Sequence, residues 1–216
     1  MTLAIQPKEI SREIYMKDPC DLYTSEFFSG RRHRKRMYRE KSMGKCIVEC
    51  LDAKSVIDYG CGLGLLLEGV LESGVNNILG IEYSYKSASP FISKHMQSYI
   101  RFGNVMEKCD YGKFDCVVSI EVAEHILEEK SDVFVDNLVD SSNMYIILTA
   151  APPGQGGIGH INEQKKQFWI DKIEKKGFKN STDVLGKFRA KLAEKKVKLP
   201  VFVKRNMMIF KKDIQL

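Results

Sequence analysis

The fold is decided by the stretch Val56-Ile57-Asp58-Tyr59-Gly60-Cys61-Gly62-Leu63-Gly64, which three leucines follow. The apolar run predicts a buried strand, the glycines predict a tight turn, and the leucines predict the start of a helix. Three glycines at alternate positions leave no Cβ where the backbone bends sharply and approaches a ligand. The next helix would direct its N-terminal amides at that ligand, so we expect a nucleotide-like cofactor. A turn that uses glycine only for its geometry is the alternative.

A second strand and an acidic residue follow at the spacing of a strand-helix-strand unit. We predict a helix over about Leu65 to Glu72 and a strand at Ile78-Leu79-Gly80-Ile81, with Glu82 at its end. The carboxyl ends of neighbouring parallel strands share one crevice, so Glu82 would lie beside the glycine turn and accept both hydroxyls of a ribose. Glu82 follows Gly60 by 22 residues, which favours this role over that of a surface acid.

Two motifs resemble those of a known enzyme family. A nicotinamide-binding fingerprint needs a further glycine or alanine after Gly64, where this chain has two leucines. The string that begins at Asp58 instead resembles the first motif of the class I S-adenosylmethionine-dependent methyltransferases. The strand Phe114 to Ile120, followed by Glu121-Val122-Ala123-Glu124-His125-Ile126, resembles the fourth-strand motif of the same family. The resemblance implies an α/β fold with a doubly wound, mostly parallel, seven-stranded Rossmann-like sheet whose last strand is antiparallel.

The resemblance also implies a cofactor, S-adenosyl-L-methionine, and a set of residues that hold it. Asn104 stands where the family usually offers an aspartate to the adenine amino group, and a simple turn residue is the alternative there. Glu121 would lie near the reacting centre, in contact with cofactor or substrate. The residues expected to bind the cofactor are Asp58, Gly60, Cys61, Gly62, Gly64, Glu82, Asn104 and Glu121.

The segment after the next predicted strand carries the candidate for a catalytic base. Four glycines within the six residues 154–159 predict a mobile loop at the crevice, and His160 follows them. His160 is expected either to remove a proton from the acceptor, together with Glu121 as the second catalytic residue, or to cap the next helix. For His125 we favour a residue that fixes the loop through hydrogen bonds over a base near the methyl group. No metal site is predicted.

The remaining elements complete the expected fold. We predict a segment of helices or a cap over residues 1–44 and the cofactor-binding methyltransferase domain over residues 45–216. Within them, helices are expected over Arg31 to Leu51, Ser87 to Tyr99, Lys130 to Leu138, Gln164 to Lys176 and Val184 to Lys198, and strands over Ile100 to Val105, Asn143 to Ala150 and, antiparallel, Val201 to Phe210. In residues 1–30 the large apolar side chains Tyr15, Leu22, Tyr23, Phe27 and Phe28 predict packing over another part of the chain.

Composition points to a globular protein in a reducing compartment. Hydrophobic residues make up 44% and charged residues 29%, and no apolar run reaches the roughly 20 residues of a membrane helix. The first residues lack the apolar core of a signal peptide, so we expect a cytoplasmic protein with no membrane partner. The six cysteines form no CxxC pair, so neither a disulfide framework nor a zinc site is indicated. Nothing in the sequence predicts an oligomeric state.

The acceptor is expected to be a small molecule or a sugar or glycan, methylated on oxygen or nitrogen. The run Arg31 to Arg36 and the segment 161–216, with 16 Lys and Arg against 6 Asp and Glu, would suit an anionic acceptor or merely keep the protein soluble. An RNA methyltransferase that uses these basic ends is the alternative, and a module that binds the cofactor without catalysis is a further one. A nicotinamide enzyme is the least favoured. Methyltransferases acting on base amines carry an aromatic after Pro-Pro at the fourth strand, which residues 119–122 lack.

Overall fold

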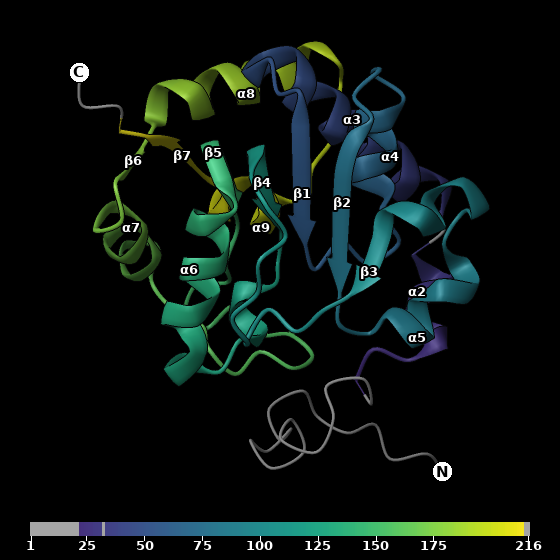
Figure 1. The fold of residues 1–216 in the computed structure, drawn as a ribbon, viewed down its shortest axis with the longest axis horizontal. Helices are drawn as coiled ribbons and strands as arrows, with labels where there is room; N and C mark the ends of the chain where they lie inside the picture. Colours follow the sequence, from purple (N-terminus) through teal and green to yellow (C-terminus); the bar gives the residue numbers. More distant parts are fainter. Residues whose placement is uncertain (1–21, 32, 214–216) are drawn as a thin grey trace.

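A computed structural model of the chain describes residues 22–31 and 33–213, and the elements lie as Figure 1 shows. Its sheet has seven strands in the order β3-β2-β1-β4-β5-β7-β6, all parallel to their neighbours except β7, which runs antiparallel to β5 and β6. This confirms the predicted fold class. The strands are β1 Ser55–Tyr59, β2 Asn77–Glu82, β3 Ile100–Phe102, β4 Phe114–Ser119, β5 Ser142–Leu148, β6 Phe178–Asn180 and β7 Met208–Lys212.

Side chains alternate along the central strands, and each face of the sheet therefore has its own core. Val56 and Ile147 point into one cluster of buried residues, whereas Ile57 and Ile146 point into the other. All five residues of β1 are buried, because helices cover both faces. The apolar run that precedes the glycine turn therefore forms a single buried strand of five residues, β1.

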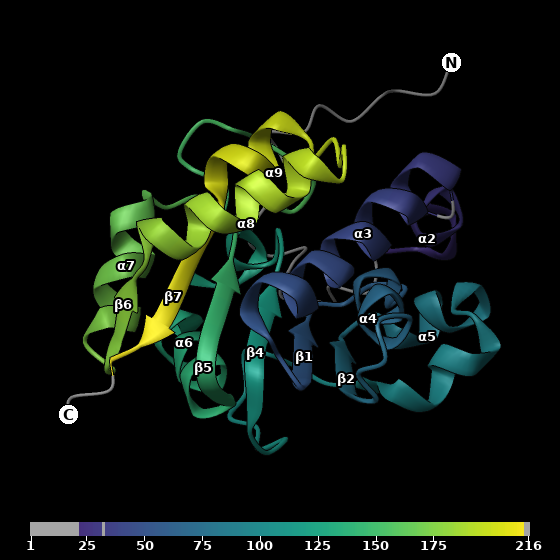
Figure 2. The same cartoon turned by 90° about the horizontal axis from the view of Figure 1, so that it is seen from above.

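The helices form a layer on each face of the sheet. Residues of α3, α4, α8 and α9 belong to the first core, and α3 and α8 lie side by side (Figure 2), whereas α6 and α7 cover the second core. None of the helices within residues 22–31 and 33–213 is long and apolar enough to cross a membrane. The α-helices are α2 Ser25–Gly30, α3 Arg34–Leu51, α4 Leu65–Leu71, α5 Tyr85–Ala88, α6 Ser131–Asp140, α7 Lys166–Glu174, α8 Thr182–Glu194 and α9 Val201–Asn206.

Two predicted elements are wrong. The helix expected over Ser87 to Tyr99 is broken into α5 and two 3-10 turns, 89–91 and 94–99, because Pro90 cannot continue an α-helix. The strand expected over Val201 to Phe210 is a strand only in its second half. Its first half is α9, which Pro200 precedes and which buries Val203 against the first core. The fixed φ of proline and this burial outweigh the strand propensity of two valines.

Helices α3 and α4 cross with their backbones in close contact, and a glycine on each helix makes this possible. A Cβ on Gly44 would lie 2.0 Å from the carbonyl oxygen of Leu66, and a Cβ on Gly69 would lie 2.0 Å from that of Lys41. No larger residue fits at either position without separating the helices. The crossing fixes α3 next to the loop from which α4 begins, and residue 44, where we expected a domain boundary, lies inside α3.

Candidate active site

The loop between β1 and α4 has the sharply bent backbone that its glycines predict. Gly60, Gly62 and Gly64 have φ angles of 79°, 58° and 70°, in the left-handed region that side chains disfavour. A Cβ on Gly60 would lie 2.4 Å from the side chain of Val122, which follows β4. Gly60 therefore serves both the turn and the close approach of Val122, and both demands are also compatible with the alternative of a turn built for geometry.

Glu82 fixes this loop from the end of β2. Its Oε2 accepts a hydrogen bond of 2.8 Å from the Gly62 N–H, and its Oε1 accepts one of 2.8 Å from the Ser84 N–H. Burial raises the pKa of the carboxyl group, while these backbone donors and the Arg31 guanidinium oppose the shift. Each oxygen keeps a lone pair for a ligand hydroxyl, as the ribose role requires.

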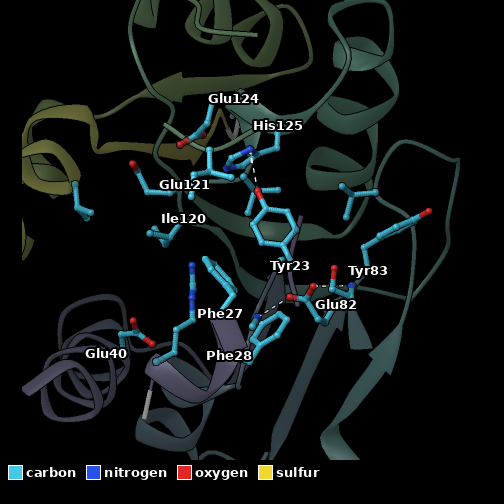
Figure 3. Close-up of a pocket in the computed structure, with 18 of the residues that line it drawn as sticks. Tyr23, Phe27, Phe28, Glu40, Glu82, Tyr83, Ile120, Glu121, Glu124 and His125 are labelled. Carbon is cyan, nitrogen blue, oxygen red and sulfur yellow. Dashed lines mark hydrogen bonds between the residues drawn. The ribbon is translucent and has the colours of Figure 1, made fainter. Parts of the chain in front are cut away.

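A pocket of about 430 Å³ opens along the carboxyl ends of β1, β2 and β4. Glu82 lines one end of it, and Glu121, Glu124 and His125 line the other, with the Tyr23 ring between them (Figure 3). Gly60 and Gly62 of the glycine turn also line the pocket. The pocket is thus long enough to bring a cofactor at the glycine turn to a second group at the other end. This is the arrangement expected at the switch point of a doubly wound sheet.

Three residues predicted to bind the cofactor lie behind the loop and outside the pocket wall. Asp58 is 4% exposed, and burial raises its pKa to about 8, with Glu40 and Glu82 adding to the shift. Burial also raises the pKa of the Cys61 thiol, which faces Gly80 of β2. A Cβ on Gly64 would meet the side chain of Ile100 in the core. These residues shape the loop.

Asn104 lines the pocket, but its side chain is already engaged in a turn. Its Oδ1 accepts a hydrogen bond of 3.0 Å from the Met106 N–H, and its Nδ2 donates one of 3.0 Å to Glu107. This is the geometry of an Asx turn, the alternative role expected for it. An adenine contact from Asn104 stays a prediction, and it would use the second lone pair of Oδ1.

Glu121 and Glu124 bring two carboxylates to the end of the pocket opposite Glu82 (Figure 3). Glu121 has a φ of 55°, and its N–H donates to the Thr149 hydroxyl at 2.7 Å. Glu124 is fully buried, and neither of its carboxylate oxygens has a hydrogen-bond partner among the residues the structure describes. Burial, and then the charge of Glu121, raise the pKa of Glu124 to about 8.

Both candidate histidines lie beside Glu124. His160 Nε2 is 3.9 Å from Glu124 Oε1, and the rings of His125 and His160 meet edge to face with their centroids 5.0 Å apart. His125 Nδ1 lies 2.9 Å from the carbonyl oxygen of Gly159 and 3.0 Å from the Tyr23 hydroxyl. The loop-fixing role that we favoured for His125 is therefore present, and burial lowers the pKa of its imidazole to about 4.

The loop that carries His160 is held by hydrogen bonds at both ends. Glu163 accepts from the N–H groups of Gly154 and Gly156 at 2.7 and 2.6 Å and contacts His160 Nδ1 at 2.9 Å. Gln155 contacts Glu121 at 3.5 Å and accepts from the Asn206 side chain at 2.9 Å. A mobile loop was expected here, but these bonds tie it to the β4 end and to α9.

Several pocket residues were not predicted as site residues. Tyr23 and Phe27 bear out the packing expected of the apolar N-terminal side chains, whereas Tyr15 lies outside the described residues. Arg31 enters the pocket with its guanidinium 4.1 Å from the centre of the Phe27 ring, and burial lowers its pKa to about 10. Phe202 of α9 also lines the pocket. The only sequence signal for Tyr23, Phe27 and Arg31 was the clustering of aromatic and basic residues before α3.

Comparison with known proteins gives the family. A family model described as a methyltransferase domain matches residues 28–143, more than half of the chain. The chain belongs to the methyltransferase domain family. Membership confirms the predicted class and its cofactor, S-adenosyl-L-methionine.

The relatives and this methyltransferase-domain protein overlap over different shares of their lengths. A mitochondrial ubiquinone biosynthesis O-methyltransferase of Dictyostelium discoideum is 29% identical over 145 residues, 60% of this chain but only 42% of the relative's own length. A magnesium protoporphyrin IX methyltransferase of Synechocystis, solved with S-adenosylmethionine bound, is 16% identical with a TM-score of 0.58 over 98% of this chain and all of that chain. A sugar N-methyltransferase of a Streptoalloteichus species is 11% identical with a TM-score of 0.63, over 87% of this chain and 92% of that one. At these identities the structural likeness shows the fold.

Proposed function

We propose that the protein transfers a methyl group from S-adenosyl-L-methionine to an oxygen or nitrogen of a small-molecule or sugar acceptor. The observation that carries this proposal is one continuous pocket, lined by Gly60, Gly62 and Glu82 and by ionisable side chains at the end opposite Glu82. The cofactor supplies an activated methyl group on a sulfonium. The chain must therefore align the two reactants, exclude water and remove a proton from the acceptor.

Each end of the pocket has a distinct task. Glu82, already fixed by the Gly62 and Ser84 N–H groups, would accept the ribose hydroxyls. Gly60 and Gly62 leave the backbone free to approach the cofactor, since neither carries a Cβ. Glu121 would lie near the reacting centre, because it stands two residues after the end of β4 and lines the pocket.

The predicted base is His160. The Glu163 carboxylate at 2.9 Å from Nδ1 orients the ring and would stabilise a proton taken up at Nε2. Replacing His160 with alanine should reduce turnover of the true acceptor by about a hundredfold or more and leave cofactor binding unchanged. Unchanged turnover would remove His160 from the reaction.

Basic side chains on the N-terminal side of the pocket support an anionic acceptor. Arg31, Arg36 and Arg39 all line the pocket, and Glu40 shares its charge between Arg36 at 2.6 Å and Arg39 at 3.8 Å, which leaves a net positive charge on this side. A guanidinium pairs with a carboxylate or phosphate through two parallel hydrogen bonds, which would orient an acceptor as well as bind it. Phe27 and Phe202 provide apolar walls on the same side.

The basic C-terminal segment gives weaker support to the RNA alternative. Three lysines of the α8 region are paired, Lys187 with Asp183, Lys191 with Glu194, and Lys195 with Glu49. Paired cations contribute less to phosphate binding than free ones. An RNA substrate would make activity fall steeply with salt, whereas a small acceptor would show only a mild dependence.

A thermal-shift screen with S-adenosylmethionine, S-adenosylhomocysteine, NAD and NADP tests the cofactor directly. Stabilisation by the first two ligands alone is expected, and stabilisation by NAD would overturn the proposal. A panel of anionic and neutral hydroxyl and amine acceptors follows. If the protein binds S-adenosylmethionine but consumes it with none of these acceptors, the result would favour the further alternative, a module that binds the cofactor without catalysis.

A further inference from the structure

Three side chains with the chemistry of metal ligands meet at the end of the pocket opposite Glu82. One potential ligand atom from each of Glu124, His125 and His160 lies within 4.8 Å of the other two. His160 follows His125 by 35 residues, so sequence spacing gives no sign of a metal site. The structure brings them together because the loop after β5 folds back over the 3-10 turn 123–125, where the N–H groups of Ile161 and Asn162 donate to the Glu124 carbonyl oxygen at 3.0 Å.

The Glu124 carboxylate lacks the partner that its burial demands. The residue is 0% exposed, both of its oxygens are buried, and neither makes a hydrogen bond within residues 22–31 and 33–213. The Ala151 N–H and the Glu121 carboxyl group face this carboxylate, and His160 Nε2 is 3.9 Å from Oε1, which is beyond hydrogen-bond distance. Atoms that bind one ion at about 2.1 Å lie roughly 3 to 4 Å apart, so this separation fits two ligands of the same ion.

Both imidazoles are oriented as metal ligands are. Since the Gly159 carbonyl oxygen can only accept, the His125 Nδ1 at 2.9 Å carries the proton, and its Nε2 keeps a lone pair. The Glu163 carboxylate, 2.9 Å from His160 Nδ1, fixes the same tautomer there. A ligating histidine almost always donates its other N–H to a carboxylate or backbone carbonyl in this way.

We propose that Glu124, His125 and His160 bind one divalent metal ion at the acceptor end of the pocket. Glu121 lines the same end and has one buried, unpartnered oxygen, Oε1, so it is available as a fourth ligand. Two imidazoles with carboxylates and no thiolate suit Mn²⁺, Fe²⁺, Co²⁺ or Zn²⁺, and are unlike the all-oxygen shell that Ca²⁺ prefers.

The ion would change the task of His160, and this part rests on the proposed methyl transfer. A divalent cation that contacts the acceptor oxygen lowers the pKa of the hydroxyl, so the proton is lost to solvent water without a protein base. His160 would then hold the ion, and loss of His160 would reduce both turnover and metal binding. If His160 acts only as a base, its loss would reduce turnover and leave metal binding intact.

Binding of Mn²⁺ to the full chain, measured by the loss of the free Mn²⁺ electron paramagnetic resonance signal, tests the site without any acceptor. One ion per chain is expected, with a dissociation constant below about 100 μM. Glu124→Gln and His160→Ala should each weaken binding by about tenfold or more. His95→Ala is the matched control, because His95 is exposed and pairs with Glu68. This variant should bind Mn²⁺ as tightly as the wild type does. Thermal stabilisation by S-adenosylhomocysteine checks that every variant is folded.

The outcomes separate this inference from the proposed function. Failure to bind Mn²⁺ below about 1 mM, or equal binding by the wild type and both site variants, would overturn the metal site while methyl transfer could stand. Mn²⁺ binding that depends on Glu124 and His160, in a protein that methylates no acceptor, would support the site and count against the proposed function. If both hold, a chelator should abolish methyl transfer, and Mn²⁺ should restore it, with cofactor binding unchanged.

Discussion

Replacing Glu82 with glutamine should weaken cofactor binding far more than it weakens the fold. The carboxylate oxygens accept hydrogen bonds of 2.8 Å from the N–H groups of Gly62 and Ser84. A glutamine offers one oxygen and one NH₂ group, so one backbone N–H would face another donor, and the charge that strengthens the bonds to the ribose hydroxyls would be lost.

The magnitude follows from these contacts. Loss of one charge-assisted hydrogen bond costs about 1.5 to 3 kcal/mol. The free-energy cost of replacing such a bond to a ribose hydroxyl by a weaker neutral bond falls in the same range. A net loss of about 2 to 3 kcal/mol corresponds to a dissociation constant roughly 30- to 150-fold higher. The fold is expected to suffer less, because burial already raises the pKa of Glu82 and the neutral amide avoids that cost.

Isothermal titration with S-adenosylhomocysteine measures the effect in the wild type and in Glu82→Gln. Glu128→Gln is the matched control, since Glu128 is exposed and lies outside the pocket wall. Its affinity should equal that of the wild type. A Glu82→Gln protein that is folded and binds within about threefold of the wild type would refute the ribose role of Glu82.

Two further predictions concern stability. The folded-state pKa of Asp58 is raised from 3.8 to about 8, so the unfolded chain releases this proton first, and the free energy of unfolding should fall as pH rises from about 4 to 8. Asp58→Asn should remove this pH-dependent part of the free energy of unfolding, which urea titrations at pH 5 and pH 8 measure. If the difference in free energy of unfolding between variant and wild type is the same at both pH values, the raised pKa is contradicted. Gly69→Ala should lower the free energy of unfolding by about 1 to 3 kcal/mol, because its Cβ would lie 2.0 Å from the Lys41 carbonyl oxygen. Gly186→Ala in α8, whose Cβ would meet nothing within 4 Å, is the control and should be neutral or stabilising in the same urea titration.

The cofactor half of the molecule could be predicted because its signals are local. The strand before Gly60, the turn and Glu82 lie within one strand-helix-strand unit, where the parallel pairing of β1 and β2 leaves little freedom. The glycine positions and the spacing of Glu82 therefore predicted this unit and the place of Glu82 beside the turn, while the resemblance to methyltransferases predicted the rest of the sheet.

The acceptor half could not be predicted to the same depth because its contacts join distant segments. His125 and His160 meet through a loop that folds back, and Arg31 reaches the pocket from the turn before α3. Nothing local in the sequence encodes these distances. The error at α9 has another origin, since strand propensity at Val201 and Val203 is weaker than the effect of Pro200 and of core burial.

The glycine pair at the crossing of α3 and α4 offers a marker for comparing relatives. Gly44 and Gly69 each accommodate the backbone of the opposite helix, so a larger residue at one position cannot be tolerated while the other helix keeps its place. Homologues with small residues at both positions should inherit the same placement of the helix that carries Arg36 and Arg39 into the pocket. Homologues without small residues at positions 44 and 69 should methylate different acceptors, while they retain the glycine turn and the acidic residue at the position of Glu82.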